Sequence, residues 1–317
     1  MISFIIIGKN EGARFIRCLH SIEKVLSVTH LKDYEIVYVD SKSEDNSIAE
    51  AQKMDHVRIF LISGTCNAAI ARNIGGQEAK GDILYFIDGD LELNENFLLN
   101  ILNDKEELNY PFISGIVTDY NYDDDWNFTS KEKRHLNTKD SYQLVVGGVF
   151  IVTKKRWDKL KGLKTKLKVN EDLDFGMRMA ENGCPLLLKA LPMVNHHTHP
   201  YHSEASVKNF TFREAKYNAV LLRNHITHFK ILLYILRMRL TFMQLCLSIT
   251  LSLLTPWALL LYPILLIKPS YKAHKLYKIN AFKDFYYTII GDLFFIINIF
   301  TFFPKEIKLE YKEIKDQ

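Results

Sequence analysis

The sequence has 317 residues, of which 48% are hydrophobic and 25% charged, enough for one large or two modest domains with a sizeable core. Its four cysteines lie far apart without a C-x-x-C pair, which indicates neither a zinc site nor a disulfide framework and favours a reducing compartment. The net charge of +4 is uneven, because residues 206–283 carry twelve Lys and Arg but one acid, Glu214. This basic region indicates an anionic partner, and the neighbouring apolar runs favour a membrane over nucleic acid.

Short apolar runs alternate with helical periodicity through the first ninety residues. The N-terminal run lacks a basic segment before it, which is typical of a first strand rather than a signal peptide. Alternating strands and helices predict a parallel sheet with right-handed crossovers. The predicted strands are residues 2–7, 34–39, 57–62 and 83–87, and helices are expected after residue 10, from Ser43, and over 68–79.

The fourth predicted strand ends in two carboxylates, Asp88 and Asp90, separated by Gly89. Ligands of α/β proteins bind at the carboxyl ends of parallel strands. Two carboxylates at such an end can hold a hard divalent cation and, through it, a diphosphate. The alternative is a simple turn, because Asp-Gly is also common turn chemistry.

The regularity is weaker between residues 94 and 205. A Lys-rich segment, residues 161–170, has the composition of a mobile cationic loop, and Glu171 and Asp172 open a helix for which Gly183 is the C-cap. Residues 119–140 are polar and are expected to form a surface excursion. Further helices are predicted over 97–108 and 154–160, and strands over 112–117, 144–152 and 185–191.

The C-terminal third combines basic and apolar features. Lys and Arg recur every seven residues at 216, 223, 230 and 237, which on one helix forms either a solvated ridge or the polar face of an interfacial helix on anionic lipid. Residues 240–267 contain no charge, although Pro256 and Pro263 interrupt them, and 285–303 form a second apolar run broken by Asp292. The intervening loop, 268–283, has five Lys and no acid up to residue 283, which favours re-entrant or interfacial helices over two full spans.

Over residues 1 to about 200 the chain resembles a family 2 glycosyltransferase of the GT-A fold. That resemblance implies a Rossmann-like, mostly parallel α/β sheet flanked by helices, here followed by membrane-associated helices. No single motif carries it, and the order and spacing of several do. These are Asn10-Glu11 after the first strand, Val39-Asp40-Ser41, Ala71-Arg72-Asn73, Ile87-Asp88-Gly89-Asp90, Gly147-Gly148, and Glu171-Asp172 followed by Arg178 and Gly183.

The resemblance implies a nucleotide-sugar site at the strand ends. Asp40 would accept a hydrogen bond from the base or ribose, with a helix cap or Asx-turn as the alternative, and Glu11 would assist at the base unless it is only a helix-start acid. Arg72 would reach the base or diphosphate, unless it is an ordinary surface arginine. Asp88 would lie near the ribose or metal, and Asp90 would bind Mn²⁺ or Mg²⁺, which neutralises a diphosphate leaving group.

The same resemblance assigns the bond-making side of the reaction. Asp172 would be the general base of an inverting displacement, with Glu171 orienting it, although acids at a helix start also stabilise the helix dipole. Gly147 and Gly148 would border the acceptor pocket, unless they form a bulge. A cluster of four histidines follows the last predicted strand, and one of them, His199 as readily as His197, is a candidate third metal ligand.

We therefore expect a membrane-associated inverting glycosyltransferase at the cytosolic face of the cell membrane. It would transfer sugar from a nucleotide-sugar to a glycan or a polyprenyl-linked acceptor in cell-surface polysaccharide synthesis. The expected organisation is a catalytic domain over 1–205, with a nucleotide half (1–93) and an acceptor half (94–205). A basic interfacial helix over 206–240 and apolar membrane-associated helices with a polar tail over 241–317 would follow.

Three alternatives are weaker. A sugar-phosphate nucleotidyltransferase needs a Gly-rich phosphate loop after the first strand, and residues 8–13 lack the G-x-G-T-R pattern. A non-catalytic, membrane-anchored nucleotide-sugar-binding protein would lack the candidate base Asp172, which is present. A processive synthase usually carries a Q-x-x-R-W motif, and residues 206–240 have none, which favours single or few additions.

Overall fold

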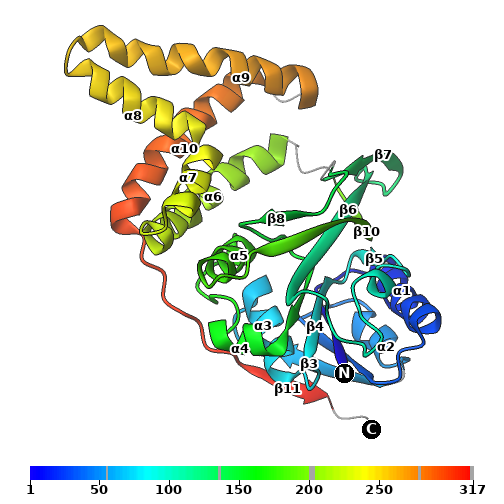
Figure 1. The fold of residues 1–317 in the computed structure, drawn as a ribbon. Coiled ribbons are helices and arrows are strands. Elements are labelled where there is room, and N and C mark those ends of the chain that lie inside the picture. Colours follow the sequence, from blue (N-terminus) through cyan, green and yellow to red (C-terminus); the bar gives the residue numbers. More distant parts are fainter. Residues whose placement is uncertain (55, 135–136, 200–203, 278–279, 315–317) are drawn as a thin grey trace. The chain divides into compact units, whose positions relative to one another are not determined.

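The fold is taken from a computed structural model that describes residues 1–54, 56–134, 137–199, 204–277 and 280–314. The chain forms two compact units (Figure 1). The first contains Met1–His199 together with Lys305–Gln317, and the second contains Pro200–Pro304. The polar tail therefore belongs to the first unit, whereas the sequence placed it with the apolar helices.

The first unit is built on a parallel βαβ core. The strands lie in the order β3-β2-β1-β4, and all seven residues of β1 are buried because helices cover both faces of the sheet. Figure 1 shows these elements around one sheet. The elements are β1 (Ile2–Gly8), α1 (Ala13–Thr29), β2 (Tyr34–Asp40), α2 (Ser47–Ala51), β3 (Val57–Ile62), α3 (Ala68–Glu78) and β4 (Ile83–Asp88).

Mixed strands extend this core to the order β11-β3-β2-β1-β4-β9-β6-β10-β5, with β7 paired to β6 and β8 to β10. β6 runs parallel to β10, while β9 is antiparallel to both β4 and β6. The additional elements are β5 (Leu91–Leu93), η1 (Leu98–Asn100), β6 (Phe112–Tyr122), β7 (Phe128–Lys133), β8 (Ser141–Gln143), β9 (Phe150–Thr153), α4 (Lys154–Leu160), α5 (Glu171–Glu181), β10 (Leu186–Thr198) and β11 (Tyr311–Ile314).

The core lies on both faces of the sheet, as alternation along β1 requires. Phe4 packs on one face in a cluster with Phe15 of α1, and Ile5 packs on the other in a cluster with Phe175 of α5. Gly75 of α3 approaches β1 so closely that a Cβ there would lie 2.2 Å from Ile5 Cγ2. This contact sets α3, and with it Arg72, firmly against the sheet.

Several predicted boundaries are wrong. Residues 97–108 form only the short η1 and turns rather than a helix, and the strand predicted over 144–152 begins at Phe150. The polar excursion after residue 119 is partly regular, because β6 continues to Tyr122 and pairs with β7. The Lys-rich loop is held in place, since Lys164 pairs with buried Asp174 at 3.1 Å and Leu167 is fully buried.

The second unit is helical. Among the described residues, α10 is the one helix long and apolar enough to cross a membrane, and α7 with α8, bent by 93°, qualifies only as a pair. α8 and α9 lie side by side (Figure 1). The elements are α6 (Glu204–His225), α7 (Phe229–Met238), α8 (Leu240–Ser252), η2 (Pro256–Leu260), α9 (Leu261–Tyr277) and α10 (Ala281–Thr301).

The basic ridge expected over 206–240 is interrupted, because α6 ends at His225 and α7 begins at Phe229. Arg223 also turns inward within the second unit. Its guanidinium donates to the carbonyl oxygens of Asn298 at 2.8 Å and Ile299 at 2.7 Å, near the end of α10. Arg223 is therefore a C-terminal helix cap and not part of a continuous lipid-facing face.

Candidate active site

The predicted site residues gather where the parallel strands end. β1 lies between β2 and β4, so the strand order reverses at its carboxyl end, the usual position of a ligand site in this class of sheet. After β4 the chain turns at Gly89, whose N–H donates to the Ile7 carbonyl at 2.8 Å. The turn leaves Asp88 and Asp90 at this edge.

Arg72 connects the two halves of the site. Its Nη2 lies 2.6 Å from Asp88 Oδ1 and its Nη1 lies 3.0 Å from Glu171 Oε1. The residue is only 2% exposed, so it is a buried ion-pair partner and not a surface arginine. Although burial alone would lower the pKa of Arg72, the charges of Asp88 and Glu171 outweigh it and raise the pKa. The α3 arginine thus joins the β4 acid to the start of α5.

Asp172 stands next to this pair at the N-terminus of α5. Burial, reinforced by the charge of Glu171, raises the pKa of Asp172 to about 7, against the opposing effect of Arg72. The backbone N–H of Leu173 donates to its Oδ1 at 2.8 Å. A carboxylate with a pKa near neutrality is suited to accept a proton in general base catalysis.

Asp90 is held from one side by a buried histidine. His196 of β10 bonds through Nε2 to Asp90 Oδ2 at 3.1 Å and through Nδ1 to Asp119 Oδ1 at 2.7 Å. Burial lowers the pKa of His196, but these hydrogen bonds outweigh it and raise the pKa to about 9. Arg134 donates from Nε and Nη2 to the two carboxylate oxygens of Asp119, at 2.8 Å each. His196 therefore lies between two carboxylates, and Arg134 Nη2 also lies 2.6 Å from its Nδ1.

The two histidines predicted as metal ligands lie elsewhere. His197 faces away from Asp90, because successive residues of a strand point to opposite faces, and its ring contacts Arg17 Nη1 at 2.7 Å and Glu92 Oε2 at 3.2 Å. His199 is exposed, and its ring centroid lies 4.4 Å from that of Trp126. His202 of the same cluster lies outside the described residues. His196 belongs to the histidine cluster that the sequence indicated, but it was not selected as a site residue.

The residues expected at the nucleotide base are both engaged within the protein. Asp40 is fully buried, accepting from Tyr38 Oη at 2.8 Å and from the Ser43 N–H at 2.8 Å. This is the local turn that the sequence allowed as its alternative. Glu11 lies beside Arg14, 2.7 Å between Oε2 and Nη2. Burial, with the charge of Asp90, raises the pKa of Glu11 to about 7.

The Gly147-Gly148 pair has one tightly enclosed member. A Cβ on Gly148 would lie 2.6 Å from Asp88 Oδ2 and 2.8 Å from Arg72 Nη2, whereas one on Gly147 would meet nothing within 4 Å. Gly148 therefore borders the Asp88–Arg72 pair, and Gly147 faces open space.

One carboxylate oxygen of the acidic pair Asp88 and Asp90 is suited to bind a divalent cation. Asp90 Oδ1 is buried without a hydrogen-bond partner, an arrangement that an oxygen-preferring cation such as Mg²⁺ or Mn²⁺ would satisfy. Across the described part of the chain, no three His, Cys, Asp or Glu side chains converge as a preformed metal site.

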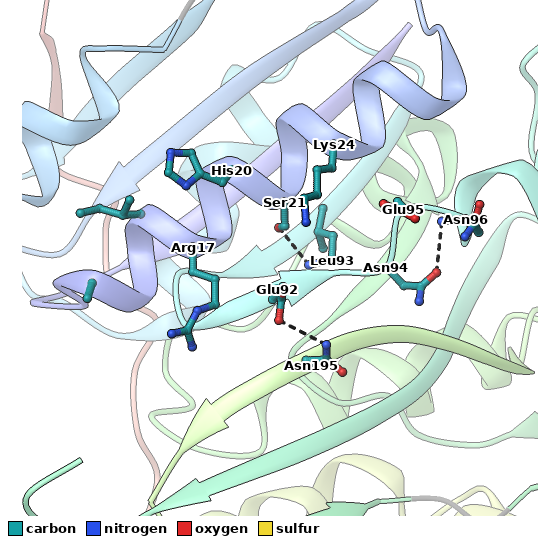
Figure 2. Close-up of a pocket in the computed structure, with 12 residues that line it drawn as sticks. Arg17, His20, Ser21, Lys24, Glu92, Leu93, Asn94, Glu95, Asn96 and Asn195 are labelled. Carbon is teal, nitrogen blue, oxygen red and sulfur yellow. Dashed lines mark hydrogen bonds between the residues drawn. The ribbon is translucent and has the colours of Figure 1, made fainter. Parts of the chain in front are cut away.

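Two cavities lie along α1. One of about 360 Å³ is lined by Glu11, Arg14, Trp126 and His197. Arg14 lies over the Trp126 ring at 4.6 Å. A larger one of about 510 Å³ lies on the other side of Arg17, between α1 and the segment after β5 (Figure 2). In Figure 2 Glu92 accepts from Asn195 Nδ2, at 3.2 Å, in its wall.

A family model described as Glycosyl transferase family 2 matches residues 3–167, more than half of the chain. The chain is a family 2 glycosyltransferase. Two curated relatives are the glycosyltransferase GlyG of Streptococcus pneumoniae, 32% identical over 133 residues, and the glycosyltransferase AglE of Haloferax volcanii, 28% identical over 147 residues. The matches cover 40% and 41% of this chain, and 42% and 47% of those relatives.

A solved structure of GalNAc-T7 with UDP, GalNAc and Mn²⁺ has a similar fold, with a TM-score of 0.51 at 18% identity. The similarity covers 67% of this chain and 47% of that one. It confirms the GT-A type of mixed α/β sheet for this glycosyltransferase. The family match ends at residue 167, so Glu171 and Asp172 lie beyond it.

Proposed function

We propose that this glycosyltransferase inverts configuration and uses Asp172 as its general base. The observation that carries the proposal is the Arg72 link between Asp88 and Glu171, which joins the end of β4 to the N-terminus of α5. On the β4 side of this link, Asp88 and Asp90 are the acids that would hold a divalent cation for the diphosphate. On the α5 side, Asp172 is a carboxylate whose pKa is raised to about 7.

In the proposed reaction Asp172 removes the proton of the acceptor hydroxyl while that oxygen attacks the anomeric carbon. The nucleoside diphosphate departs from the opposite face, so one displacement inverts the configuration. Glu171 pairs with Arg72 and so holds Arg72 and the start of α5 in place. Gly148 leaves room beside the Asp88–Arg72 pair.

A bound Mn²⁺ or Mg²⁺ would supply positive charge to the diphosphate leaving group. Asp90, through its unpartnered Oδ1, and Asp88 are the residues that would hold it. His196 engages the other oxygen of Asp90 and so fixes that carboxylate. The similar GalNAc-T7 fold was crystallised with Mn²⁺, which supports a divalent cation in this role.

The donor in this proposal is a nucleotide-sugar, and the acceptor is a glycan or a polyprenyl-linked sugar at the cytosolic face of the cell membrane. The apolar, exposed surface of the second unit supports membrane association, for example Leu253 and Leu254 at 84% and 85% exposure. Attachment would keep the site close to a lipid-linked acceptor.

The test measures nucleoside diphosphate release from a panel of nucleotide-sugars with Mn²⁺ and a polyprenyl-linked acceptor. Wild type should turn over one donor, and NMR of the product should show the inverted anomer. Asp90→Ala should lose its metal-dependent activity, whereas Asp158→Asn, an exposed acid on α4, should not. A product with retained configuration would contradict the mechanism, and metal-dependent turnover by Asp90→Ala would contradict the metal assignment.

A further inference from the structure

The polar tail closes the edge of the catalytic sheet. β11 pairs antiparallel with β3, with Tyr311 opposite Ile62 and Ile314 opposite Ile59. The Ser63 N–H donates to the Glu310 carbonyl at 2.9 Å, and Tyr311 Oη donates to Glu78 Oε1 at 2.7 Å. Figure 1 shows β11, in red, beside β3.

The tail also binds the loop that leads to Asp172. Thr165 Oγ1 donates to the Ile307 carbonyl at 2.8 Å, and the Ile307 N–H donates back to it at 2.7 Å. Glu306 Oε2 accepts from the Lys166 N–H at 3.1 Å. Thr165 is itself buried at 6% exposure. Residues 306–314 are therefore part of the folded catalytic unit.

Because β11 is part of the catalytic sheet, the chain segments before and after the helical unit both belong to the catalytic unit. The chain leaves the catalytic unit at His199 and rejoins it at Lys305, four residues after α10 ends at Thr301. A folded sheet lies on a single side of a bilayer, because its polar backbone edges and loops cannot be satisfied in lipid. The number of complete membrane crossings between residues 200 and 304 must then be even.

We infer that residues 200–304 enter and leave the membrane on the same face, and that the α8–α9 hairpin dips into it and returns. α10 is then not a lone transmembrane anchor, although it alone among the described helices is both long and apolar enough to cross a membrane. This inference rests on the membrane association included in the proposed function.

The hairpin has the charge pattern of a re-entrant segment. Residues 240–267 are uncharged, with Arg237 and Arg239 before them and Lys268 and Lys272 after them, so both ends suit the same anionic headgroup layer. α8 has 13 residues and is about 20 Å long, shorter than the roughly 30 Å hydrocarbon core. The turn between the arms is strongly apolar and open, with Leu254 and Trp257 exposed at 85% and 78%.

The first experiment checks the closure itself. In a variant whose four cysteines are replaced by alanine, Leu61→Cys with Lys312→Cys should form a disulfide on mild oxidation of membranes, since these residues are opposite in register. The matched pair Phe60→Cys with Lys312→Cys should cross-link much less, because residue 60 points to the other face. Equal cross-linking of both pairs, or of neither, would overturn the closure.

The second experiment determines sidedness in sealed spheroplasts that express the full chain. N-terminal and C-terminal tags should be protected from external protease alike and digested together after lysis. Lys275→Cys should stay unlabelled by an external impermeant thiol reagent and be labelled after lysis. A C-terminal tag exposed outside while the N-terminal tag is protected would overturn the even crossing, and external labelling at 275 would overturn the re-entrant hairpin.

The two proposals fail in different ways. Recovery of the chain in the soluble fraction, with the cross-link intact, would reject membrane association while leaving the tail closure correct. Recovery in membranes with the tags on opposite sides would reject this inference alone.

Discussion

The positive charge of Arg72 offsets the negative charges of the carboxylates around it in the site. It is buried between Asp88 and Glu171, and the acids Asp172 and Asp90 lie nearby. Burial, with the charge of Asp90, raises the pKa of Asp88 even though Arg72 opposes this. Without the guanidinium, several carboxylates would face one another in a poorly solvated site.

We predict that Arg72→Ala destabilises the protein by about 3–5 kcal/mol, the usual cost of leaving a buried charge without its partner. Arg72→Lys should be milder in stability but still impaired in turnover, because an ammonium is too compact to reproduce the planar fork that serves two carboxylates. Urea unfolding followed by circular dichroism measures the change, with the exposed Lys155→Ala as control. A loss below 1 kcal/mol would contradict the bridging role.

We predict that Asp172→Asn lowers the activity but raises the stability at pH 8. Removing a positioned base is expected to lower kcat by about 10²–10⁴-fold. The folded-state pKa of Asp172 lies above its ordinary value, so the native protein binds an extra proton and loses stability as pH rises towards 7. The amide removes that cost, and the melting temperature at pH 8 should rise by about 2–4 °C. A variant that is both inactive and less stable would point to a structural role instead.

The pH profile provides a second test of the same residue. Because only the ionised Asp172 can accept a proton, kcat/KM should increase about tenfold per pH unit below about 7 and level off above it. Initial rates between pH 5 and 9 at saturating metal measure this. A rate that is flat down to pH 5 would be incompatible with a base of this pKa.

At the scale of elements, the segment before β9 is positioned by its contact with β4 and α3. We predict that Gly148→Ala lowers turnover at least about tenfold, because overpacking at a buried contact forces its neighbours to move. Its new methyl would lie 2.6 Å from Asp88 Oδ2 and 2.8 Å from Arg72 Nη2. Gly147→Ala is the matched control and should retain activity, since nothing lies within 4 Å. Equal effects of the two substitutions would refute this steric account.

The central strands were predictable because each is a short apolar run buried on both faces. The helix predicted over 97–108 was wrong because asparagines bind their own backbone there and compete with helical hydrogen bonds. Asn103 Oδ1 accepts from the Lys105 and Glu107 N–H groups, at 2.9 and 3.0 Å. Asn94 Oδ1 accepts from the Asn96 N–H at 3.1 Å. Local side-chain chemistry overrode a weak periodicity.

The site was predictable only in part. The sequence indicated Arg72, Asp88, Asp90, Glu171 and Asp172 through their order, and the structure brings them to one edge of the sheet. It could not indicate which histidine would meet Asp90, because that depends on the strand register of β10 against β6. The sequence also predicted a mobile Lys-rich loop, because composition does not reveal partners that are distant in the chain. One such partner is Asn73, whose side-chain amide forms hydrogen bonds with the Leu163 carbonyl at 2.7 Å and the Leu163 N–H at 2.8 Å.

At the scale of the whole molecule, the tail is expected to support the catalytic unit. We predict that deleting residues 305–317 destabilises the first unit by several kcal/mol, because it exposes the β3 edge and removes the partners of Thr165. Differential scanning calorimetry should show a lower transition for the truncated protein. Lys308→Ala, an exposed tail residue, is the control. An unchanged transition would show that β11 contributes little.

The position of β11 also has a consequence for the order of synthesis. The ribosome makes β3 about 250 residues before the strand that covers its edge, and the apolar helices emerge between the two. During that interval the nascent sheet presents an unpaired edge, the kind of surface on which chains misassemble. In the loop before α5, the Thr165 hydroxyl likewise lacks its partners in the tail until residues 306 and 307 appear. Completion of the catalytic unit therefore follows the synthesis of the apolar helices.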